Sequence, residues 1–93
     1  MKDTIKTLHP KKKQGVNISK EKYEIIRKAI LSTLRKHKEM PFMKLSNAVE
    51  KEVDGKFEGS VMWYVTTVKL DLEARGDVKR VPKSRPQLVR LGK

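Results

Sequence analysis

The stretch from Trp63 to Val81, WYVTTVKLDLEARGDVKRV, decides the fold of this 93-residue chain. It predicts an amphipathic helix whose apolar face recurs at helical spacing through Val61, Val65, Val68 and Leu72. Arg75 and Gly76 supply the cation and the left-handed residue that commonly end a helix. Val78 to Val81 follows at once as a short strand that contains basic residues. The stretch therefore indicates a core helix, a glycine stop and a basic strand.

Two further helices and two further extended segments are expected around this stretch. The first helix begins after an N-cap at Ser19 and ends near His37, and the second spans about Met43 to Val53. Met40-Pro41-Phe42 joins them as an extended connector that can supply a short strand, because a proline disfavours helix at the residue before it. Gln87–Leu91 is the last strand. The residues expected to be buried together are Tyr23, Ile26, Ile30, Leu34, Leu45, Val49, Val65, Val68 and Leu72.

The order helix, strand, helix, helix, strand, strand predicts an α+β chain with the winged helix-turn-helix fold, in which the last two strands form the wing. Residues 1–17 are expected to be an extended basic N-terminal arm, and residues 18–93 to be the winged-helix domain. Helix 3 of this domain is expected to begin after an N-cap at Ser60.

The residues Leu72 to Arg80, LEARGDVKR, resemble the helix-to-wing junction of bacterial winged-helix regulators of the multiple-antibiotic-resistance-regulator type. More narrowly, Trp63 to Gly76 with Ser84-Arg85-Pro86-Gln87 resembles a family of small bacterial winged-helix proteins of unassigned function. This second resemblance runs from about Leu8 to Leu91. It implies the fold, but it supplies no catalytic residue and no ligand.

Lys and Arg outnumber Asp and Glu by 23 to 11, which gives a net charge of +12. Such a basic surface attracts polyanions, and nucleic acid is the first class to consider. The charge balance is +9 over residues 1–38, −3 over residues 39–77 and +6 over residues 78–93. Attraction for phosphate is therefore expected from the arm and the wing, while the middle of the chain is expected to repel it.

The candidate nucleic-acid contacts fall into three groups. Those of the wing are Lys79, Arg80, Lys83, Arg85 and Arg90, on a loop braced by two prolines. Those of the arm are Lys11, Lys12 and Lys13, and those of helix 3 are Thr66, Thr67 and Lys69. A solvated basic hairpin and a solvated charge run are the alternatives for the wing and the arm.

Helix 3 also carries apolar residues opposite its core face, namely Trp63 and Leu70. A helix that is apolar on both faces is usually covered on both. We expect the arm or a second subunit to cover this face, since it offers few of the side chains that read base edges in the major groove. The alternatives are major-groove reading by Thr66 and Thr67, and an exposed patch that binds another partner.

Several classes of function are not expected. The chain has no cysteine, and His9 and His37 have no metal-ligand spacing, so neither a metal site nor a cofactor is predicted. No motif of an enzyme is present. No apolar run approaches the length of a membrane span or of a signal peptide core, which favours a cytoplasmic protein without a membrane partner.

The sequence thus favours a small nucleic-acid-binding protein, regulatory in role, with DNA more favoured than RNA as its partner. It would grip phosphate through the wing and the arm, with little sequence specificity. The alternative is a winged helix that serves as a protein-interaction or dimerisation module, with helix 3 at the interface of a homodimer.

Overall fold

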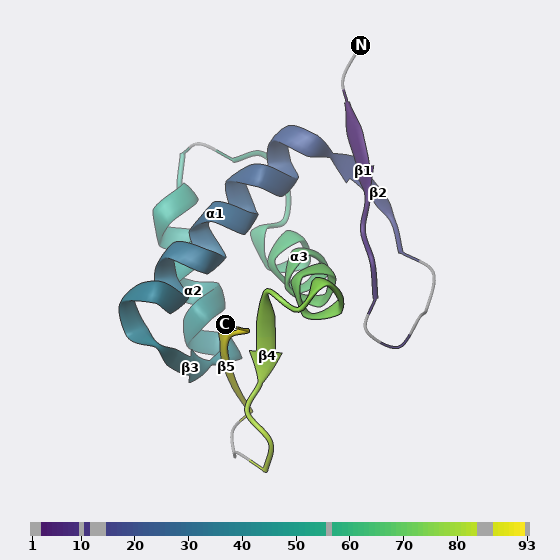
Figure 1. Cartoon of the computed structure of the whole chain (residues 1–93). Coiled ribbons are helices and arrows are strands. Elements are labelled where there is room, and N and C mark those ends of the chain that lie inside the picture. The colour runs from purple at the N-terminus through teal and green to yellow at the C-terminus, as the bar shows by residue number, and fades with distance from the viewer. Residues whose placement is uncertain (1–2, 10, 12–14, 56, 84–86, 93) are drawn as a thin grey trace.

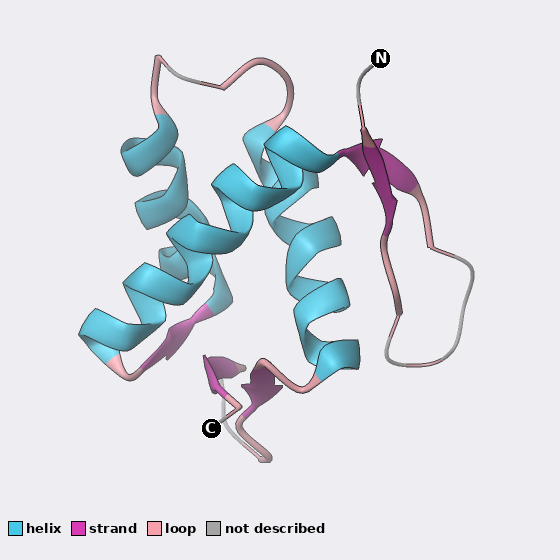
Figure 2. Cartoon of the chain, turned by 45° about the horizontal axis from the view of Figure 1, so that its top comes forward, coloured by secondary structure: helices cyan, strands magenta, loops and turns pink. Residues whose placement is uncertain are grey.

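The computed structural model describes residues 3–9, 11, 15–55, 57–83 and 87–92, and it confirms a mixed α+β chain (Figure 1). Three helices pack together, and two small antiparallel sheets flank them (Figure 2). In chain order the elements are β1 (Thr4–Lys6), β2 (Asn17–Ser19), α1 (Lys20–His37), β3 (Glu39–Pro41), α2 (Phe42–Val53), α3 (Val61–Arg75), β4 (Val78–Arg80) and β5 (Leu88–Leu91). None of the described helices is long and apolar enough to cross a membrane.

The predicted ends of α1 and α3 are confirmed. The Ser19 hydroxyl accepts a hydrogen bond from the backbone N–H of Lys22, and the Ser60 hydroxyl accepts one from that of Trp63. Gly76 ends α3 with a φ of 83°, in the left-handed region where a side chain would be strained. These local signals place α3 and the strand after it.

The predicted core is also confirmed, because all nine residues expected to be buried lie in one apolar cluster. Others complete this cluster: Ile18, Ala29, Val53, Val78 and Val89. It lies between the three helices and the inner face of the sheet formed by β3, β5 and β4. Burial of this apolar surface is the main force that holds the helices to the sheet.

The three-stranded sheet has β5 at its centre, paired with β3 on one side and with β4 on the other. The connector before α2 therefore does supply a strand, as its proline predicted. Arg90 lies directly opposite Glu39 on β3 and opposite Lys79 on β4. Directly opposite residues share a face of a sheet, so these three residues form the outer sheet face, while the adjacent Val89 points into the core.

The N-terminal segment differs from the extended arm that the sequence predicted. Thr4–Lys6 pairs with Asn17–Ser19, so the segment folds back as a hairpin beside α1 and α3 (Figures 1 and 2). Thr7 extends the pairing, since its N–H donates to the Val16 carbonyl at 2.8 Å and its hydroxyl accepts from the Val16 N–H at 3.0 Å. Backbone and hydroxyl groups hold this hairpin, and an apolar sequence pattern gives little sign of them.

Candidate nucleic-acid interface

The outer sheet face presents two adjacent cations. Lys79 and Arg90 lie directly opposite each other on β4 and β5, and both are exposed. Like charges in this position repel each other. Within the described part of the chain neither side chain forms an ion pair, although Glu39 lies on the other side of Arg90. A phosphate placed between the two cations would relieve the repulsion.

Arg80 lies at the edge of the same hairpin and is held in a fixed position by α3. Its Nε donates to Glu73 Oε1 at 2.7 Å. This hydrogen bond is the main reason that the pKa of Arg80 is raised above its ordinary value. The Glu73 side chain is only 6% exposed, so Arg80 supplies charge that a nearly buried carboxylate requires.

Lys69 supplies the second counter-charge to Glu73, with its Nζ 3.3 Å from Glu73 Oε1. The residue is 8% exposed, and its ammonium lies 5.1 Å from the centre of the Phe42 ring. Lys69 is thus buried and paired, unlike the exposed contact that the sequence suggested, and its contact with nucleic acid stays a prediction. Its charge is already neutralised inside the protein, because α2 and β4 enclose the flank of α3 on which it lies. We call Lys69, Glu73 and Arg80 the Glu73 cluster.

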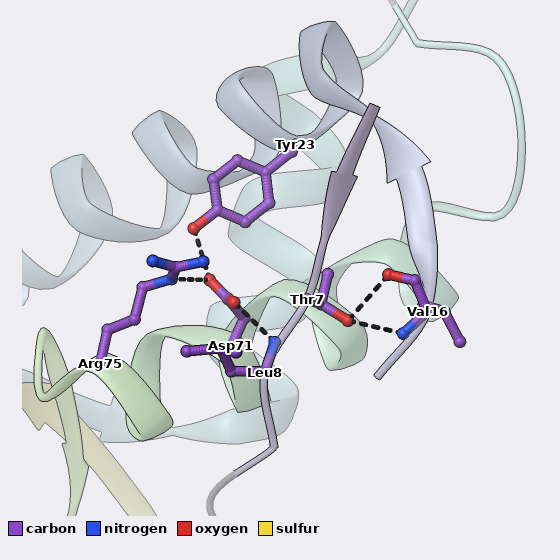
Figure 3. Close-up of polar contacts among 6 residues, drawn as sticks. All are labelled: Thr7, Leu8, Val16, Tyr23, Asp71 and Arg75. Atoms are coloured by element: carbon purple, nitrogen blue, oxygen red, sulfur yellow. Dashed lines mark hydrogen bonds and ion pairs between the residues drawn. The ribbon is translucent and has the colours of Figure 1, made fainter. Parts of the chain in front are cut away.

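Asp71 organises the opposite flank of α3, although the sequence pattern gives no sign of this role. This carboxylate is fully buried, and it accepts hydrogen bonds from the Leu8 N–H at 2.8 Å, from the Tyr23 hydroxyl and from Arg75 Nε at 2.9 Å (Figure 3). Burial, followed by the hydrogen bond to Asp71, raises the pKa of Tyr23 to about 12. Asp71 thereby ties the N-terminal segment, α1 and the end of α3 together.

The Glu73 cluster on one flank and Asp71 with its partners on the other leave the outward face of α3 without a free charge. Trp63, Thr66 and Ala74 are exposed on this face, and Thr67 and Leu70 are half-buried. The acidic residues of the helix lie on its two flanks, where cations pair with them. The outward face is therefore neutral, and it consists of small polar and apolar side chains.

Trp63 is the most exposed aromatic feature of this face. It is 46% exposed in the single chain, so the N-terminal segment does not bury it. That segment lies instead along the Asp71 flank, where Leu8 is hydrogen-bonded. The sequence suggested that either the N-terminal arm or a second subunit covers Trp63 and Leu70. Coverage by a second subunit stays a prediction.

The remaining predicted contacts divide between described and undescribed parts of the chain. Lys11 is exposed in the loop of the N-terminal hairpin, and Lys83 is exposed at the tip of the β4–β5 hairpin with a φ of 61°. Lys12, Lys13 and Arg85 lie outside the described residues. Among the residues that the structure does describe, no group of three His, Asp or Glu side chains is placed to hold a metal ion.

The profile of a family of unknown function, DUF6958, matches residues 4–88. Because this match spans most of the chain, the chain belongs to that family. Neither the curated proteins nor the solved structures contain a match. The family agrees with the resemblance to small proteins of unassigned function, while the winged-helix part of that resemblance stays a prediction.

Proposed function

We propose that this member of the DUF6958 family is a small DNA-binding protein with a winged helix-turn-helix fold. In this interpretation α2 and α3 form the helix-turn-helix, and β4 and β5 form the wing. The wing and the loop of the N-terminal hairpin grip phosphate. The observation that carries the proposal is the exposed, directly opposed pair Lys79 and Arg90 on the outer sheet face.

The placement of the acidic residues supports this function. The balance of −3 over residues 39–77 does not lie on the outward face of α3, because Asp71 and Glu73 are buried and paired with cations. The exposed carboxylates of residues 39–77 lie off this helix, on the second half of α2 and after it and on β3, at Glu50, Glu52, Asp54, Glu58 and Glu39. A phosphate backbone can therefore approach α3 and the wing without meeting an unpaired carboxylate on that helix.

The grip would be nearly independent of base sequence. Base edges in the major groove are read mainly by Arg, Lys, Asn and Gln, and the outward face of α3 offers Thr66 and Thr67 instead. Hydroxyl groups of threonine bond to phosphate as readily as to bases. Phosphate contacts from the wing position the protein on the strand, and they carry no sequence information directly.

A second candidate function, a homodimerisation or protein-interaction module, is favoured by exposed apolar side chains on α2 and α3. Met43, Met62 and Trp63 are all exposed. The Ser46 hydroxyl on α2 lies 3.1 Å from Met62 Sδ on α3, so the N-terminal halves of the two helices lie side by side. Adjacent exposed apolar residues often mark a protein interface.

Titration of a labelled random-sequence duplex at low salt, beside a mass measurement in solution, separates the two functions. We expect the monomer to bind duplexes of different sequence equally well, and the double variant Lys79→Gln/Arg90→Gln to bind them more weakly. A protein that binds no duplex at low salt, and that forms a dimer, would support the interaction module instead.

A further inference from the structure

We infer that Trp63 is a stacking platform for an unpaired base of single-stranded nucleic acid. The inference rests on the proposed function, because the phosphate grip must hold the strand against the ring. It adds the class of substrate, since the bases of an intact duplex are already stacked on one another.

Aromatic neighbours fix the orientation of the Trp63 ring. The Tyr64 ring meets it edge to face, with centroids 4.9 Å apart and planes at 82°. Phe57 meets Tyr64 in the same way, at 4.9 Å and 77°. The Lys22 ammonium lies 5.3 Å from the centre of the Tyr64 ring and 5.6 Å from that of Phe57. Trp63 thus projects from a packed cluster, and this support reduces the entropy that a stacked base would cost.

The backbone at Gly59 packs closely against the Tyr64 ring of this aromatic cluster. A Cβ at this position would lie 3.3 Å from Tyr64 Cε2. The φ of Gly59 is 114°, a backbone conformation that residues with a side chain rarely adopt. The chain therefore packs tightly against the ring that supports Trp63. The indole itself stays open, since no ring of a described residue lies parallel to it, and its N–H has no described acceptor.

Charge and distance favour a nucleic-acid strand as the occupant. The chain carries +12, the supporting cluster contains an ammonium group, and the outward face of α3 has no free carboxylate. An α-helix rises about 1.5 Å per residue, which places Trp63 about 18 Å along the axis from Arg75 at the wing end. A strand of several nucleotides can therefore contact the wing and reach Trp63 over a neutral surface.

Two strands with the same number of phosphates test the platform, namely a twelve-nucleotide oligothymidylate and its fully abasic analogue. Trp63 is the sole tryptophan, so its fluorescence reports on this ring alone. We expect oligothymidylate to quench the fluorescence and the abasic strand to bind without quenching it. A blunt duplex of the same length should quench it less than the single strand does.

Variants measured by anisotropy of a labelled strand complete the test. Base–aromatic stacking accounts for an affinity loss of about 5- to 150-fold when the ring is removed. Trp63→Ala should therefore weaken binding to oligothymidylate by that factor and leave binding to the abasic strand unchanged. Met43→Ala, which removes another exposed apolar side chain, is the matched control and should leave both affinities unchanged.

Three outcomes would overturn the inference, and they are distinguishable. Equal binding of both strands without quenching would refute the platform while the phosphate grip stands. Binding of neither strand nor duplex at low salt would refute the proposed function and the platform together. A blue shift of Trp63 fluorescence with rising protein concentration, without any oligonucleotide, would place the ring in a self-association interface.

Discussion

Asp71 is a fully buried carboxylate whose charge is tolerated because three donors from three segments satisfy it (Figure 3). Asp71→Ala removes the acceptor of the Tyr23 hydroxyl and of the Leu8 N–H. A buried donor left without an acceptor costs about 1–3 kcal/mol. This penalty applies to the Tyr23 hydroxyl, while the hydrogen bond of the Leu8 N–H is only part-buried. We expect the free energy of unfolding, measured in urea, to fall by at least this amount. Glu50→Ala, at an exposed carboxylate on α2, should change it little, and equal effects of the two substitutions would contradict the role of Asp71.

Tyr23 makes the stability of the folded protein depend on pH in the alkaline range. Its pKa is raised from 10.0 to about 12, because burial and the hydrogen bond to Asp71 favour the neutral phenol. A raised folded-state pKa contributes stability below the unfolded value, and this contribution is lost as pH rises through the folded value. The Tyr23 contribution should therefore decline between about pH 10 and 12. Titration of tyrosinate absorbance should show a step near pH 12 that is absent in Tyr23→Phe; an unchanged titration would rule out this assignment.

The N-terminal hairpin depends on close backbone contact at Gly15. A Cβ there would lie 1.7 Å from the Thr7 carbonyl oxygen, so Gly15→Ala cannot fit without separating the two strands. We expect hydrogen exchange to show lost protection of the Thr7 and Val16 amides while the core helices stay protected. Asn17→Ala, at an exposed position of β2, is the control. Full protection in Gly15→Ala would show that the hairpin tolerates the side chain.

Elements set by local signals could be predicted from the sequence. The spacing of Val65, Val68 and Leu72 fixed the inward face of α3, and Ser60 and Gly76 fixed its ends. The N-terminal hairpin could not be predicted, because its strands have three residues each and pair across a long loop. Short polar strands of this kind show no period that distinguishes them from an extended arm.

The candidate interface could be predicted in part, because it depends on the exposure of basic residues. Basic residues are usually exposed, and Lys79, Lys83 and Arg90 follow that rule. Lys69 departs from it, because the buried Glu73 requires a counter-charge that only the packed structure reveals. Asp71 likewise has the sequence pattern of an ordinary surface residue of a helix, because its partners Leu8 and Tyr23 lie far from it in the sequence.

Across the whole molecule, the net charge of +12 is divided unevenly among surfaces. The acidic residues of α3 are enclosed on its flanks, and Glu50, Glu52, Asp54 and Glu58 are exposed on and after α2. The outer sheet face carries Lys79 and Arg90 beside the exposed Glu39. A polyanion would therefore approach from the side of α3 and the β4–β5 hairpin. This arrangement makes the salt dependence of binding the property that identifies which cations contact phosphate.

The most direct measurement is the slope of log K against log salt for random duplex DNA, compared among charge-neutralising variants. Lys79→Gln and Arg90→Gln should each lower the magnitude of the slope by about 0.9, the contribution of one phosphate contact. Lys69→Gln removes one charge as well, but a charge that is buried and paired with Glu73, so it should leave the slope unchanged while the variant stays folded. An unchanged slope in Lys79→Gln and Arg90→Gln, or an equal drop in all three variants, would contradict a phosphate grip by the outer sheet face.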